Sequence, residues 1–299
     1  MAHDSTDPTR GFPQYAGTGA PADAADLSEI ATWAGTNIDR VVATQAALTT
    51  GFTPIYAGMR IAVTAIPGAT FRYSGSAWVM EGIATFASAS ARDAAITSPA
   101  AGMTIFRTDN LQVQTYTGGK WNYTTALVPI IPTSLSGTLT GASIGPSGAV
   151  TLTAATGPFV INNSFTPEFD NYLVKADGSP ALGNSLTLQL AASGTVDATA
   201  TNYDQFDSIA ATGSTAGNWP LLTGSRVVWS YDINLFNPAR AMPTRALINT
   251  VGFNAAGANP IGKLLANGHR ASVAYDGLGV SFTTSTTTGT IRIYGYNNN

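Results

Sequence analysis

The sequence predicts a mainly β protein with an N-terminal helix, two small repeated β-hairpin modules and a C-terminal antiparallel β-sandwich of jelly-roll type. Three observations lead to this prediction. After residue 133, short runs of alternating or β-branched residues follow one another with turn residues between them. A pair of similar segments precedes these runs, and one stretch near the N-terminus spaces its apolar residues as a helix does.

The N-terminal region divides into an arm and a helix. Residues 1–22 are rich in proline, glycine and threonine, and we expect an extended arm there. We expect a helix over residues 23–47 that begins at a capping Asp23 or Asp26, with Glu29 in the first turn. Its apolar stripe comprises Leu27, Ile30, Ala31, Ala34, Ile38, Val41 and Val42. The helix either packs on its own domain or anchors the chain by bundling with copies of itself or docking on a larger body.

An internal repeat follows, with a first module at residues 48–84 and a second at residues 85–128. The pattern Tyr-x-Gly-x-x-Trp at residues 73–78 recurs at residues 116–121. The glycine permits a tight turn, which sets the tyrosine and the tryptophan across two strands as an aromatic pair. The pair forms either the core of a small β unit or an exposed aromatic platform for sugars.

A neutral stretch separates the modules from the C-terminal part. No charged residue occurs between Lys120 and Glu168, and Pro129 and Pro132 mark a domain junction. We expect a linker with leading strands at residues 129–158 and the β-sandwich at residues 159–299. The apolar content of residues 121–167 is too high for a solvated linker, so we expect trimerisation to bury this stretch between subunits.

The last residues are predicted to close the sandwich. Asp276-Gly277 lies between two alternating apolar runs, which predicts a hairpin turn. The run Thr290–Tyr296 predicts a terminal strand that lies in a sheet near Phe169–Val174. Residues 194–224 are expected to form a long loop.

Composition narrows the functional classes. Charged residues make up 10% of the 299 residues and the net charge is -3, so we expect no nucleic-acid binding. The absence of cysteine excludes disulfides and thiolate metal sites. No apolar run approaches the ~20 residues of a spanning helix, so no membrane insertion is expected, and the N-terminus does not resemble a signal peptide. A low charge with 44% hydrophobic residues favours a surface that is buried in an assembly or covered with small polar residues.

No catalytic set, metal site or cofactor motif is found, so we do not expect an enzyme. His269 is predicted to be a structural residue, hydrogen-bonded at the start of a strand. Tyr203, Asp204, Asp207 and Trp219 lie in the predicted long loop and are our candidate receptor contacts. Asp204 and Asp207 are also compatible with a glycosidase carboxylate pair, a Ca²⁺ site or plain solvated turn residues.

Three sets of residues form motifs of a recognisable kind: residues 91–103 with residues 116–121, Phe165-Thr166 with residues 169–172, and residues 289–296. These motifs resemble those of bacteriophage minor tail and receptor-binding proteins (tail fibre or tail tip proteins), especially of phages of Gram-positive hosts. It implies a homotrimeric virion protein with a jelly-roll-like head that binds host-surface saccharide. Residues 1–47 would then attach to other tail or baseplate proteins, and the protein would be made in the host cytoplasm and released by lysis.

Two other hypotheses remain open. One is a capsid decoration or head-fibre protein with a purely architectural role. The other is a tailspike that cleaves glycans with Asp204 and Asp207.

Overall fold

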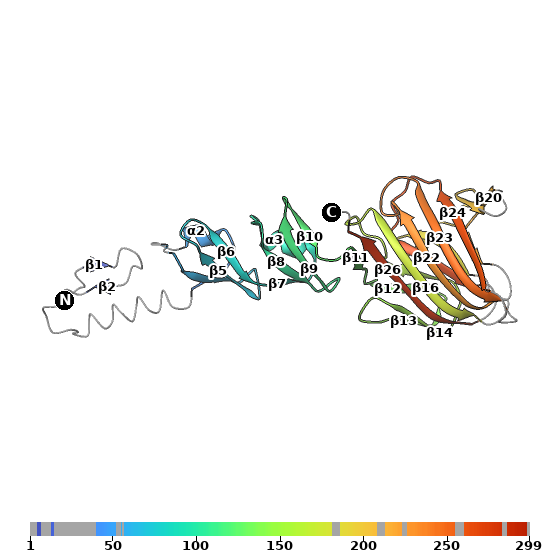
Figure 1. The fold of residues 1–299 in the computed structure, drawn as a ribbon, viewed down its shortest axis with the longest axis horizontal. Helices are drawn as coiled ribbons and strands as arrows, with labels where there is room; N and C mark the ends of the chain where they lie inside the picture. The colour runs from blue at the N-terminus through green and yellow to red at the C-terminus, as the bar shows by residue number, and fades with distance from the viewer. Residues whose placement is uncertain are drawn as a thin grey trace. The chain divides into compact units, whose positions relative to one another are not determined.

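The computed structural model of the chain describes residues 5–6, 13–14, 40–51, 55, 57–180, 186–207, 213–222, 226–254, 260–282 and 286–297. The described protein is mainly β, with several sheets. It divides into two compact units, Met1–Thr124 and Thr125–Asn299, and Figure 1 labels many of their strands.

The first unit contains strand where part of the N-terminal helix was predicted. A short antiparallel pair, β1 (Ser5–Thr6) with β2 (Pro13–Gln14), lies within the predicted arm. The rest of the arm and residues 23–39 of the predicted helix lie outside the described residues. The helix does not extend to residue 47, because β3 (Val41–Val42) pairs in parallel with Ala62 and Val63. The two β-branched valines suit a strand, and the only helix at this point is the single turn α2 (Ala47–Thr50).

Two four-stranded sheets of the same topology complete the first unit. In each, a parallel strand pair is joined through a short helix, and two antiparallel strands follow. The first sheet has the order β3-β4-β5-β6, with β4 (Arg60–Val63), β5 (Ala69–Tyr73) and β6 (Trp78–Gly82). The second has the order β7-β8-β9-β10, with β7 (Ala84–Phe86), α3 (Ala89–Ala95), β8 (Thr104–Arg107), β9 (Gln112–Thr117) and β10 (Lys120–Tyr123). The sheets therefore start at residues 41 and 84, and the tryptophans are the first residue of β6 and the second residue of β10.

The predicted aromatic pairs are confirmed. Tyr73 lies opposite Trp78, with ring centroids 5.3 Å apart, and Tyr116 lies opposite Trp121, at 5.2 Å. Gly75 adopts a φ of 106° in the turn of the first pair, a conformation that costs glycine little. All four rings pack against the hydrophobic core, so they have the structural role and do not form an exposed platform.

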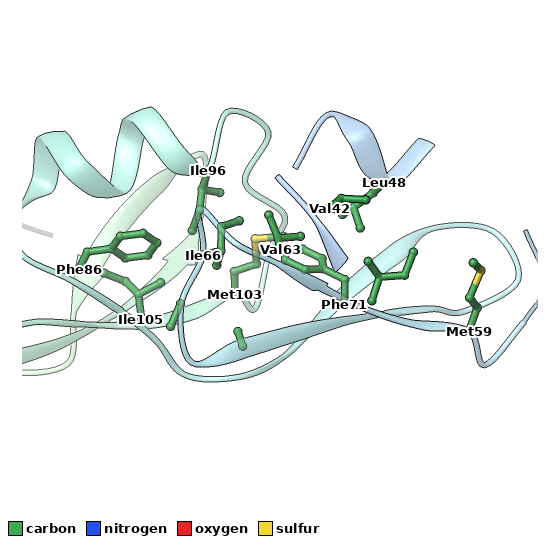
Figure 2. Close-up of a cluster of buried hydrophobic side chains, with 13 residues drawn as sticks. Val42, Leu48, Met59, Val63, Ile66, Phe71, Phe86, Ile96, Met103 and Ile105 are labelled. Atoms are coloured by element: carbon green, nitrogen blue, oxygen red, sulfur yellow. The ribbon is translucent and has the colours of Figure 1, made fainter. Parts of the chain in front are cut away.

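One hydrophobic cluster joins the two sheets of the first unit. Figure 2 shows Val63, Phe71 and Ile66 of the first repeat with Ile105 and Met103 of the second in this cluster. Hydrogen bonds reinforce the contact: the Gln45 side chain donates to the carbonyl of Ser98 (2.9 Å) and accepts from its N–H (3.1 Å). The two repeats therefore share a core and do not fold as separate modules.

The described residues of the second unit form two antiparallel sheets. The larger has the order β13-β14-β26-β16-β22-β23-β24-β19-β20, and β11 also pairs with β26. Its ten strands are β11 (Leu127–Pro129), β13 (Thr140–Ile144), β14 (Val150–Thr156), β16 (Asn171–Pro180), β19 (Tyr203–Asp207), β20 (Gly213–Ala216), β22 (Arg226–Phe236), β23 (Thr244–Asn254), β24 (Pro260–His269) and β26 (Thr287–Tyr296). The six strands of the smaller are β12 (Ser134–Gly137), β15 (Phe159–Asn162), β17 (Leu186–Ala192), β18 (Thr195–Val196), β21 (Trp219–Leu222) and β25 (Gly277–Phe282).

The last strand lies in a sheet beside β16, as predicted, and it occupies the interior of the larger sheet. β26 pairs with β14 on one side and with β16 on the other, where Ile293 lies opposite Val174. Gly295 lies against the ring of Phe169, and the hydroxyl of Tyr296 donates to Asn234 (2.5 Å). Both residues are therefore held in the sheet.

The predicted hairpin at Asp276-Gly277 is wrong. β24 ends at His269 in the larger sheet, whereas β25 begins at Gly277 in the smaller sheet, so residues 270–276 cross between the two. The crossing segment bonds to distant backbone: Tyr275 N–H donates to Pro238 O (2.8 Å), and Asp276 N–H to Ala191 O (3.1 Å). The alternation of apolar residues predicted the strand β25, but such a pattern does not indicate which strands pair with β25.

The loop predicted at residues 194–224 is wrong, because this range contains the strands β18, β19, β20 and β21. The leading strands expected within residues 129–158 are present as β12, β13 and β14. Apolar side chains of the neutral stretch, including Val128, Leu152 and Phe159, are buried within this one chain. Burial between subunits is therefore not needed to explain the composition of residues 121–167.

Candidate interaction surfaces

The structure brings two of the four predicted contact residues together in the interior. Tyr203 and Trp219 are almost completely buried, and their rings meet edge to face with centroids 5.3 Å apart. The Tyr203 hydroxyl accepts a hydrogen bond from Leu190 N–H (2.9 Å), and the Trp219 indole N–H donates to Gly268 O (3.0 Å). Neither ring has surface to offer a receptor, so we do not retain these two residues as contacts.

The two aspartates of that prediction lie on β19. Asp204 forms an exposed ion pair with Arg270, whose guanidinium donates to both carboxylate oxygens (2.5 and 2.7 Å). Asp207 is the last residue of β19, and the structure does not describe its side chain. A carboxylate held on an arginine in this way is a surface ion pair, and it is not poised as a catalytic acid or base.

A polar cluster around Asp197, which includes the buried side chains of His269 and Tyr275, lies beside these residues. The Asp197 carboxylate accepts hydrogen bonds from Thr199 N–H (3.0 Å), the Asn202 amide (2.9 Å) and the Tyr275 hydroxyl (2.8 Å). The Nε2 of His269 lies 3.0 Å from the same carboxylate, and His269 is fully buried. The cluster therefore joins the segment after β18, the end of β24 and the crossing segment.

Burial and hydrogen bonding shift the pKa values of the cluster. Burial lowers the pKa of His269, and this effect outweighs the attraction of Asp197, so the imidazole is mainly neutral at pH 7. Burial alone would raise the pKa of Asp197, but hydrogen bonds from Thr199, Tyr275 and Asn202 outweigh it and hold the pKa well below its usual range. Sequence reasoning missed Asp197 and Tyr275, and it placed His269 at a strand start, whereas His269 ends β24.

The Asp197 cluster has a structural role. A histidine, a carboxylate and a tyrosine within hydrogen-bond reach could transfer protons, but a general acid or base must reach its substrate. His269 and Tyr203 are enclosed on all sides, and Tyr275 is nearly so. The geometry supports the structural prediction for His269.

The open face of the larger sheet is the clearest candidate surface. Along β23 the residues alternate: Ala246, Ile248 and Thr250 are buried, whereas Leu247 and Val251 point the other way and are exposed. The neighbouring strands add apolar side chains, and β16, β22, β23 and β24 lie side by side in Figure 1. We call the exposed apolar set the outer face: Val228, Leu247, Val251, Phe253 and Leu264, each 40–49% exposed.

Polar side chains accompany the outer face on the same side of the sheet. Lys175 lies between Asp232 and Arg292 in the strand register, and its ammonium is 2.9 Å from the Asp232 carboxylate. Hydrogen bonding to Asp232 raises the pKa of Lys175. The outer face is thus an apolar surface with a few ionic groups. The sequence indicates this face along β23. Apolar residues there occupy odd-numbered as well as even-numbered positions, so both sides of the strand carry apolar side chains.

Within the described ranges, no group of three or more His, Cys, Asp or Glu residues is arranged to hold a metal ion. No helix in the described part of the chain is long and apolar enough to span a membrane.

No family model matches the chain, and no curated protein matches it in sequence.

Proposed function

We propose that the chain is a structural protein of a bacteriophage virion, in the tail as a minor tail or receptor-binding protein, with no enzymatic role. The resemblance of residues 91–103, 116–121 and 289–296 supports the phage assignment. The outer face supports an interaction role and is the observation that carries the proposal. Exposed apolar side chains on three adjacent strands are typical of a surface that contacts another subunit or partner. A sheet face that stays in solvent usually carries charged side chains at such positions.

The two sheets of the second unit would pack as a jelly-roll-like β-sandwich. Hydrogen bonds between the sheets support this packing. Tyr203 of the larger sheet accepts from Leu190 of the smaller, and Trp219 of the smaller donates to Gly268 of the larger. Such a sandwich would leave the outer face as the exposed side of the larger sheet.

The assembly we propose is a homotrimer in which the outer face contacts a neighbouring subunit. Aliphatic residues such as Leu247, Val251 and Leu264 suit a contact between copies, since such interfaces are more apolar than transient ones. Residues 1–47 would attach to other tail or baseplate proteins. The remaining surface of the second unit would contact host saccharide.

Light scattering on the purified full chain tests the assembly. We expect three times the 30.8 kDa chain mass, and the double variant Val251→Lys/Leu264→Lys should give a single chain. Leu111→Lys is the matched control, because Leu111 is equally exposed (47%) but lies in the first unit. A stable monomer of the unmodified chain would refute the trimer.

Binding of the labelled chain to bacterial cells tests the role of the second unit. We expect saturable binding that purified cell-wall saccharide competes away. The chain should release no saccharide fragments from the cells. Binding to no cell, together with incorporation into particles, would instead favour the capsid decoration or head-fibre role.

A further inference from the structure

A shallow hollow lies on the first sheet of the N-terminal unit. It has a volume of about 580 Å³ and is lined by Arg60, Gly68, Ala69, Thr70, Glu81 and Gly82. These residues come from β4, β5, β6 and the turn before β5. The opposite face of the same strands is packed in the hydrophobic cluster through Ile61 and Phe71. The hollow is therefore on the open side of a rigid three-stranded meander.

Two arginines and one glutamate organise this side. Arg60 lies directly opposite Arg72 in the β4–β5 register, an unfavourable arrangement for like charges. Glu81 on β6 relieves it, because its carboxylate lies 2.6 Å from Arg72 Nε and 3.0 Å from Arg60 Nε. The hydrogen bond from Arg72 is the main reason that the pKa of Glu81 is lowered, with further contributions from Arg60. The trio keeps one net positive charge.

The second repeat shows that this trio is not needed for folding. Thr104 lies opposite Thr115 in the equivalent β8–β9 register, with 3.3 Å between the two hydroxyl oxygens. Thr124 occupies the place of Glu81, three residues after the tryptophan, and its N–H bonds to Val113 O (3.4 Å). Three threonines thus support the same topology without any charge. The charges of the first repeat are a local addition to a fold that forms without them.

Arg60 is the part of the trio that remains available. Its side chain is 67% exposed, and its contact with Glu81 is made through Nε. Among the described residues, no other hydrogen bond of this guanidinium is found. The Nε of the Arg60 guanidinium is therefore bound to Glu81, whereas its two Nη groups can donate hydrogen bonds to a ligand. A fork oriented in this way suits the two oxygens of a phosphate or carboxylate.

We propose that the hollow is an oxyanion-binding site, in which Arg60 takes a phosphate or carboxylate group of a ligand. Thr70 lines the hollow and supplies a hydroxyl donor. Glu81 also lines the hollow, but its carboxylate is paired with Arg72, and its contact with Arg60 Nε positions the Arg60 guanidinium. The site is independent of the outer face, which lies in the other unit.

Titration of the isotope-labelled full chain by NMR tests the site. Inorganic phosphate and succinate are added separately as probes, which distinguishes the two oxyanions. For at least one probe, we expect saturable shifts of the Arg60 Nε–H signal and of the Thr70 and Gly82 amides. The affinity should be on the order of millimolar for such a small ligand.

Arg60→Thr is the decisive variant, because it installs the residue that the second repeat uses and should leave folding intact. We expect it to weaken binding by about tenfold or more, the loss of one bidentate contact. Arg270→Thr is the matched control, since Arg270 is also exposed and paired with a carboxylate but lies outside the hollow. Shifts that persist in Arg60→Thr, or that neither probe produces, would overturn the proposal.

Discussion

Replacement of Asp197 by alanine should destabilise the second unit strongly. The carboxylate is the shared acceptor for Tyr275 and His269, which are buried, and for Thr199 and Asn202, which are nearer the surface. A buried donor that loses its acceptor costs about 1–3 kcal/mol, so the two buried donors together cost about 2–6 kcal/mol. That is a large share of the ~5–15 kcal/mol that stabilises a typical domain.

Asp204→Ala is the control for this prediction. Asp204 is also an aspartate with hydrogen-bond donors on both carboxylate oxygens, but its pair with Arg270 is exposed, and such pairs contribute about 0–1 kcal/mol. The assay is hydrogen exchange at increasing urea, read on peptides from β19 and β24, because these peptides report on the second unit alone. If Asp197→Ala lowered the free energy of opening no more than Asp204→Ala does, the structural role of the cluster would be refuted.

The remaining predictions concern acid stability and the last strand. Folding lowers the pKa of both His269 and Asp197, so the unfolded chain binds more protons than the folded chain in acid. The free energy of unfolding should therefore fall as the pH drops below about 6.5, where His269 of the unfolded chain is protonated, and again below about 3.8, where Asp197 of the unfolded chain is protonated. Thermal melting at pH 7, 5 and 3.5 measures this, and a melting temperature that does not fall with pH would contradict it. Gly295→Ala should cost about 1–3 kcal/mol, since the added Cβ would lie 2.4 Å from the Phe169 ring. Gly262→Ala is its control, because the nearest atom there is 3.6 Å away, and equal effects of the two changes in urea unfolding would count against the packing of β26.

The sequence predicted individual strands better than it predicted their partners. The alternation of β25 and β26 and the Tyr-x-Gly-x-x-Trp pairs are local patterns, and the structure confirms these elements. The pairing of β25 with β15 and β17 depends on contacts far apart in sequence, so local turn chemistry at Asp276-Gly277 misassigned it. The strands within residues 194–224 were missed for a related reason: they are short and interrupted by polar residues.

The candidate site was predictable only in part. Aromatic and acidic residues near one another suggested a binding loop, but burial of Tyr203 and Trp219 follows from the packing of two sheets and not from their immediate neighbours. The outer face could have been predicted from the sequence, because β23 has apolar residues at odd-numbered as well as even-numbered positions. The Asp197 cluster joins residues up to 78 positions apart, and no local pattern could reveal it.

Antibody labelling of phage particles purified from a lysate that contains this chain tests the proposed tail position most directly. We expect label on the tail, and we expect the antibody directed against the second unit to label the exposed end of the tail. Label on the capsid would contradict the tail assignment, and particles without label would contradict a virion role altogether.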